Sequence, residues 1–105
     1  MTTLKIKTLT CNATEDRFGG DDPYIIVNRK KVWGPIKAEA GDELIINEQV
    51  DFKLTAVVEL WEQDLDPDDH MGTHVISQDN AGKGLQHFTF KYKTASYELA
   101  YEITE

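Results

Sequence analysis

The fold is decided by one stretch near the end of the chain, Phe88-Thr89-Phe90-Lys91-Tyr92-Lys93-Thr94-Ala95-Ser96-Tyr97-Glu98-Leu99-Ala100-Tyr101-Glu102-Ile103. Its first half alternates aromatic with polar residues, and its second half repeats the alternation after a break at Thr94-Ala95. A period of two is the pattern of a strand with one face in a core and the other in water. The stretch therefore predicts two strands, residues 88–92 and 97–103, joined by a short turn.

Similar short segments, separated by turn residues, fill the rest of the chain. They predict strands over residues 4–11, 24–27, 31–33, 43–47 and 73–76. Residues 50–62 fit either one long strand buried on both sides near its end or two short strands, and residues 36–40 are ambiguous. The apolar phase shifts between Ile6 and Leu9, which indicates a bulge. No window has the 3.6-residue stripe of a helix, so about eight strands predict an all-β, antiparallel β-sandwich.

Length and composition limit the possibilities further. A chain of 105 residues with one cysteine, Cys11, predicts a single domain over residues 1–105 without a disulfide framework. The net charge of −8 argues against nucleic acid as a partner. No membrane span or signal peptide is visible, so a cytoplasmic location is the default expectation. No Ser/His/Asp set stands in a motif context and Cys11 has no recognisable activating base, so we do not expect an enzyme.

Acidic residues gather in two segments, each between predicted strands. The segments hold nine of the nineteen acidic residues: Glu15, Asp16, Asp21, Asp22, Glu62, Asp64, Asp66, Asp68 and Asp69. If the fold brings the segments together, their charges repel strongly, and a hard divalent cation held by carboxylate oxygens is the simplest remedy. Calcium tolerates varied geometry, whereas magnesium prefers a rigid octahedron, so the pattern favours calcium.

Local spacing supports this interpretation. Asp16 and Asp22 bracket a glycine pair that lets the first loop curl, and Glu62 and Asp64 share one side of an extended segment. Zinc is an alternative, because His70 and His74 are four residues apart. That spacing faces one way on a helix but not on a strand, and acidic surroundings suit harder ions.

The order of these motifs resembles the C2 domain, a β-sandwich family known for calcium-dependent binding to phospholipids and proteins. The family's first loop, Asp, any two, Gly, any two, Asp-Pro-Tyr, is matched by Asp16, Gly19 and residues 22–24. Its other loop is matched by Trp61 to Asp64 and by residues 69–72. The resemblance covers residues 4 to 77.

The resemblance implies a ligand set and a topology. The five carboxylates at the family's calcium positions are Asp16, Asp22, Glu62, Asp64 and Asp69. Glu62 replaces the usual Asp, and the interval from Asp64 to Asp69 is one residue shorter than is common. One strand precedes the first loop and three follow the second, which implies a type II-like arrangement.

The expected function is that of a calcium-binding module. Calcium would order the two acidic loops, stabilise the domain and support binding to a protein or a neighbouring domain. The alternative is calcium-dependent binding to an anionic phospholipid membrane, with Phe18 and Leu65 touching lipid and the basic residues 29–31 assisting. Trp33 and Trp61 are expected to anchor the core rather than bind ligand.

Overall fold

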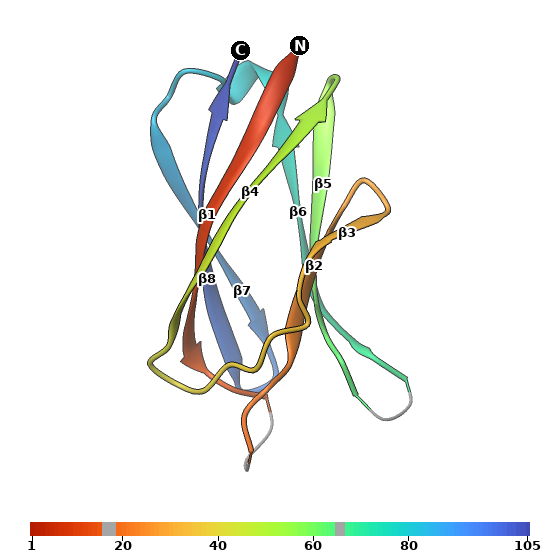
Figure 1. Ribbon diagram of the computed structural model, residues 1–105, viewed down its shortest axis with the longest axis vertical. Coiled ribbons are helices and arrows are strands. Elements are labelled where there is room, and N and C mark those ends of the chain that lie inside the picture. Colours follow the sequence, from red (N-terminus) through yellow and green to blue (C-terminus); the bar gives the residue numbers. More distant parts are fainter. Residues whose placement is uncertain (16–18, 65–66) are drawn as a thin grey trace.

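Two four-stranded sheets stack face to face (Figure 1). The computed structural model describes residues 1–15, 19–64 and 67–105. One sheet has the order β4-β1-β8-β7 and consists of β4 (Glu43–Phe52), β1 (Thr2–Ala13), β8 (Ala95–Thr104) and β7 (Leu85–Tyr92). The other has the order β3-β2-β5-β6 and consists of β3 (Lys30–Trp33), β2 (Pro23–Val27), β5 (Thr55–Glu62) and β6 (Asp69–Ser77). All neighbouring strands are antiparallel, so the predicted eight-stranded antiparallel sandwich is confirmed.

The order of the strands places both acidic loops at one end of the sandwich. β1 precedes the first loop, and β6, β7 and β8 follow the second, as the type II-like arrangement requires. Because β1 and β8 are antiparallel neighbours, the two termini lie together at the opposite end (Figure 1). A single turn of 3₁₀ helix, η1 (Gln78–Asn80), lies at that end too. None of the helical segments among the described residues has the length and apolar character to cross a bilayer.

The structure resolves the ambiguous parts of the sequence. The register of β1 shifts between Ile6 and Thr8 against both of its neighbours, which confirms the bulge. Residues 50–52 end β4 and residues 55–62 form β5, so this segment holds two strands that belong to different sheets, joined by a short connection that includes Leu54 with φ of 67°. Within residues 36–40, Ala38 forms an isolated bridge with Asp21.

The core lies between the sheets and is built from alternate residues of each strand. The C-terminal stretch contributes Phe90, Tyr97, Leu99, Tyr101 and Ile103, as its alternation predicted. Trp33 joins this core, but Trp61 does not, so the expectation for Trp61 is wrong. Leu60 and Glu62 point inward from β5, and Trp61 between them therefore faces outward.

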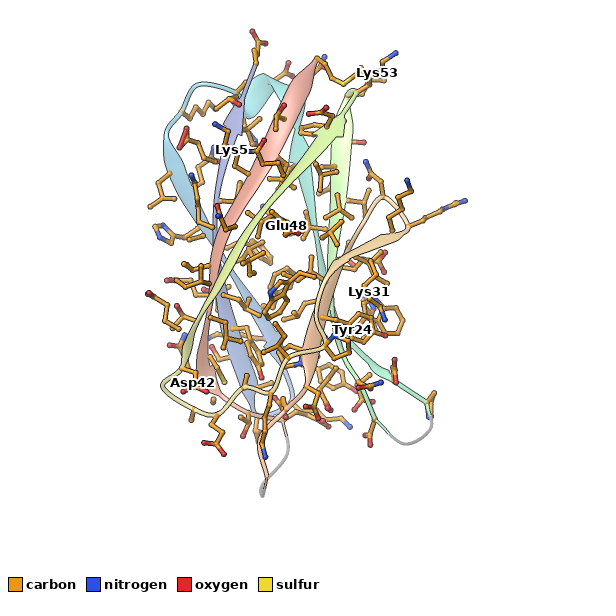
Figure 2. All side chains as sticks on the ribbon, in the orientation of Figure 1. Lys5, Tyr24, Lys31, Asp42, Glu48 and Lys53 are labelled. Carbon is orange, nitrogen blue, oxygen red and sulfur yellow. The ribbon has the colours of Figure 1, made fainter. Side chains whose placement is uncertain are left out.

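The outward Trp61 belongs to a row of rings on the outer face of its sheet. It stacks on Tyr24 with centroids 6.4 Å apart and lies 4.7 Å from His70. The Lys31 ammonium lies 4.7 Å from the Tyr24 ring centroid, and Figure 2 shows these two side chains close together beside β2 and β3. Tyr24 is 7% exposed because Trp61 and Lys31 cover it.

A buried aspartate fixes the loop end of the sandwich. Asp21 is fully buried, and its Oδ2 accepts hydrogen bonds from the Tyr97 hydroxyl at 2.6 Å and the Glu15 backbone N–H at 2.9 Å. The Asp21 backbone exchanges two hydrogen bonds with Ala38. Burial, and after it the hydrogen bond to Asp21, raises the pKa of Tyr97, so the hydroxyl keeps its proton and donates. Through these hydrogen bonds, Asp21 links β8, the first loop and the segment before β4 to one another.

The residue before Asp21 must be glycine for this contact to form. Gly20 has φ of 74°, and a Cβ there would lie 2.5 Å from the Ala38 carbonyl oxygen. Such an approach is too close for any side chain. The glycine pair predicted to curl the loop thus also lets it approach a neighbouring segment.

We predict that Tyr97→Phe lowers the free energy of unfolding by about 1.5–3 kcal/mol, because it removes a hydrogen bond to a buried carboxylate. Tyr101→Phe is the matched control, since the buried Tyr101 hydroxyl bonds the His74 ring at 3.0 Å instead. It should cost only about 0.5–1.5 kcal/mol. Urea unfolding of both variants measures the difference, and equal losses would show that the contact with Asp21 has no special weight.

Candidate metal centre

Four carboxylates converge at the loop end of the sandwich. Glu15 follows β1, Glu62 ends β5, Asp64 lies just beyond it and Asp69 begins β6. One oxygen from each of these side chains lies within 4.8 Å of the others. Residues that are far apart in the sequence, and that lie in or next to strands of different sheets, thus meet in one group of oxygen donors.

Strand register explains the position of Glu62. It continues the inward-facing positions of β5 after Val58 and Leu60, so its carboxylate lies at the mouth between the two sheets. It pairs with Asp69 of β6 on one side and Pro23 of β2 on the other. Glu62 is only 1% exposed, and its Oε2 accepts a long hydrogen bond of 3.4 Å from the Asp22 backbone.

Glu15 comes to the group from the first sheet. Its backbone N–H donates to the buried Asp21, and its carbonyl accepts from the Thr94 hydroxyl at 3.3 Å. Its side chain is 11% exposed, with Oε1 3.8 Å from the Lys93 ammonium. The resemblance did not assign Glu15 as a ligand, because it stands one position before the motif. Only the end of β1 and the contact with Asp21 bring it to the group.

Asp64 is positioned by a hydrogen-bonded chain from the first motif. Its backbone N–H donates to Asp68 Oδ1 at 3.1 Å, and the Tyr24 hydroxyl donates to Asp68 Oδ2 at 2.6 Å. Burial, and then the bond to Asp68, raises the pKa of Tyr24 to about 12, while the same bond lowers the pKa of Asp68. Asp68 therefore works as an ionised acceptor that links the two acidic loops.

The structure brings together three of the five predicted ligands, Glu62, Asp64 and Asp69. Asp22 lies immediately before β2 with its side chain exposed and outside this group, although its carbonyl accepts from the Gln63 backbone at 3.0 Å. Asp16 lies outside the described residues, as do the loop residues Phe18 and Leu65. As calcium ligands, all five residues stay predictions.

The two histidines considered for zinc have different surroundings. His70 contacts Trp61 and lies 2.9 Å from the Thr73 hydroxyl on the outer face. His74 stacks on Phe88 with centroids 3.9 Å apart, and burial lowers its pKa. Neither belongs to the carboxylate group, and their different neighbours do not favour a shared zinc ion.

The chemistry of the group suits a hard cation. Four carboxylates this close repel one another, most strongly where water is excluded around Glu62. The exposed Asp64 leaves the group open to water on one side. Carboxylate oxygens together with water are the ligands that calcium accepts in a flexible coordination sphere.

No protein-family model matches this chain, nor does any curated protein. Several solved structures do match it. A C2 domain structure superposes with a TM-score of 0.65 at 12% identity, covering all of both chains. A C2 domain of plant Extended Synaptotagmin 1 gives a TM-score of 0.62 at 14% identity, covering 98% of this chain and 92% of that one.

A third similar structure is human GIVD cytosolic phospholipase A2, solved with a fluorophosphonate inhibitor and terbium chloride. It has a TM-score of 0.57 at 17% identity, and the match covers 99% of this chain but 17% of the phospholipase. All three superpositions span nearly the whole of the present sandwich. The chain therefore has the fold of a C2 domain.

Proposed function

We propose that the chain is a calcium-binding C2-like module whose ion is held at the loop end of the sandwich. The observation that carries the proposal is the meeting of Glu15, Glu62, Asp64 and Asp69 within 4.8 Å. By resemblance to the C2 motif, Asp16 and Asp22 would add oxygen ligands from the first loop. Backbone carbonyls and water would complete the roughly 6–8 ligands that calcium takes.

Such an ion would crosslink the two sheets at the loop end. Glu15 is tied to β8 through Asp21, whereas Glu62 and Asp69 belong to β5 and β6. A cation bound to all three removes their repulsion and joins the two sheets at their open end. Ordered in this way, the loop end would serve as a surface for a protein or a neighbouring domain.

A binding module rather than an enzyme fits the site. The four carboxylates lie at the mouth of a packed sandwich, and Tyr24 and Tyr97 keep the adjacent aspartates hydrogen-bonded. Burial raises the pKa of the Cys11 thiol, which disfavours the thiolate that a nucleophile requires.

Calcium should raise the melting temperature, and magnesium should do so far less. A ligand that binds only the folded state adds about 2.7 kcal/mol at a hundredfold excess over its dissociation constant. The measurement is a thermal melt in chelator, in millimolar calcium and in millimolar magnesium, with a calorimetric titration for stoichiometry. Identical melts in chelator and calcium would refute the proposal.

Individual carboxylates can be tested with matched amide variants. Glu15→Gln and Asp64→Asn should each weaken calcium binding at least tenfold, which corresponds to about 1.4 kcal/mol. In chelator both should be neutral or slightly stabilising, because each removes a repelling charge. Asp79→Asn, in η1 at the opposite end, is the control and should bind like the wild type. If Asp79→Asn weakens binding as much, the site is misplaced.

Binding to anionic phospholipid is the second candidate function. It is favoured by three consecutive basic residues, Arg29 in the turn between β2 and β3 and Lys30 and Lys31 at the start of β3. Each basic residue near an anionic surface contributes about 1 kcal/mol. Against it stands the acidic loop end, where calcium neutralises only part of the negative charge.

We therefore predict weak recovery of the protein with anionic liposomes at about 0.15 M salt, where exposed charges are screened beyond about 8 Å. A pelleting assay with and without calcium measures it, and neutral liposomes provide the baseline. Strong calcium-dependent recovery with anionic liposomes would make membrane binding the principal function.

A further inference from the structure

A lysine from a third segment lies beside the carboxylate group. Lys93 occupies the turn between β7 and β8, with φ of 52°, and its Nζ lies 3.8 Å from Glu15 Oε1. The Tyr92 side chain, and after it the negative charges of Glu15 and Asp69, raise the pKa of this ammonium. Lys93 is therefore a cation that the chain itself supplies next to the proposed metal ligands.

The turn that carries Lys93 is fixed to the first loop. The hydroxyl of the next residue, Thr94, donates to the carbonyl oxygens of Thr14 at 2.9 Å and Glu15 at 3.3 Å. These contacts hold the backbone of the turn against the backbone of Glu15, while the Lys93 side chain is 64% exposed. Its ammonium also lies 5.2 Å from the ring centroid of Tyr92, the last residue of β7. The ammonium is thus tethered near the carboxylates but is able to swing away from them.

We propose that Lys93 is a tethered counter-ion that competes with calcium for Glu15 and so weakens calcium binding. The inference rests on the proposed function. An ion bound by Glu15 competes for this carboxylate with the ammonium that lies 3.8 Å from Oε1, and the bound ion also lies near a positive charge on the same side of the sandwich. Both effects oppose metal binding, and both vanish when the charge is removed.

Lys93 also has a role without metal. Four carboxylates within 4.8 Å repel one another, and an ammonium beside them lowers that repulsion. The chain thus balances part of its own charge when calcium is absent, and calcium replaces this internal cation with a stronger one. Lys93 accordingly raises the calcium concentration that is needed to occupy the site.

The test compares Lys93→Met with Lys91→Met. Both variants lose one positive charge from neighbouring positions, but Lys91 lies within β7 with its side chain exposed, away from the Glu15 contact. Calorimetric titration with calcium should give a dissociation constant about three- to tenfold lower for Lys93→Met than for Lys91→Met, from the removal of charge repulsion. Lys93→Arg, which keeps the charge, should bind like the wild type.

A second variant places the effect on Glu15. In the Glu15→Gln background, Lys93→Met should tighten calcium binding much less, because the carboxylate for which the two cations compete is gone. An unchanged gain in that background would overturn competition at Glu15. Equal dissociation constants for Lys93→Met and Lys91→Met would overturn the inference and leave the proposed function intact.

A melt in chelator separates the inference from the proposed function. Without metal, Lys93→Met should unfold at a lower temperature than Lys91→Met, because the carboxylates lose their internal cation. If no variant binds calcium but this difference appears, the calcium function fails and the counter-ion role stands. If the chelator melts coincide, the counter-ion role is overturned whatever the calcium titration gives.

Discussion

The loop end of this sandwich depends on the hydrogen bond between Tyr97 and the buried carboxylate of Asp21. A fully buried carboxylate is tolerated only where donors replace its water, and here the Tyr97 hydroxyl and the Glu15 backbone do so. This arrangement holds the described ends of the first loop, Glu15 and Asp21, against each other and against β8. That arrangement fixes the end of β1, which in turn fixes where Glu15 points.

The second loop is held by a similar hydrogen bond from a tyrosine to an aspartate. The Tyr24 hydroxyl bonds Asp68 at 2.6 Å, and Asp68 accepts the backbone N–H of Asp64. In each acidic loop, an aspartate accepts a hydrogen bond from a tyrosine of the sandwich; the Tyr97–Asp21 pair is buried and the Tyr24–Asp68 pair is partly buried. The aspartates in these pairs are not members of the carboxylate group. They position the residues that are.

The acidic residues of the loop end fall into two kinds, hydrogen-bonded supports and mutually repelling carboxylates. Asp21 and Asp68 accept hydrogen bonds from tyrosine hydroxyls, whereas Glu15, Glu62, Asp64 and Asp69 are brought together and repel one another. A structure that concentrates repulsion in this way responds strongly to any cation placed there. Lys93 supplies one such cation from within the chain, and the proposed calcium ion would supply another.

The sequence by itself determined the strands, the two-sheet class and the order of the acidic loops. A period of two follows directly from strand geometry, so Phe88 to Tyr92 and Tyr97 to Ile103 could be read without any knowledge of their neighbours. The resemblance to the C2 motif named Glu62, Asp64 and Asp69 as ligands, and the structure brings these three together because Glu62 ends one strand and Asp69 begins its hairpin partner. Only the tertiary structure decided which acidic residues are buried supports and which converge. Asp21 and Asp22 are neighbours in the sequence, yet Asp21 is buried against Tyr97 and Asp22 is exposed. Glu15 joins the group and Lys93 joins Glu15 through the pairing of β1, β7 and β8 across nearly eighty residues. No local pattern carries that information, because the register between distant strands is set by how the two sheets pack.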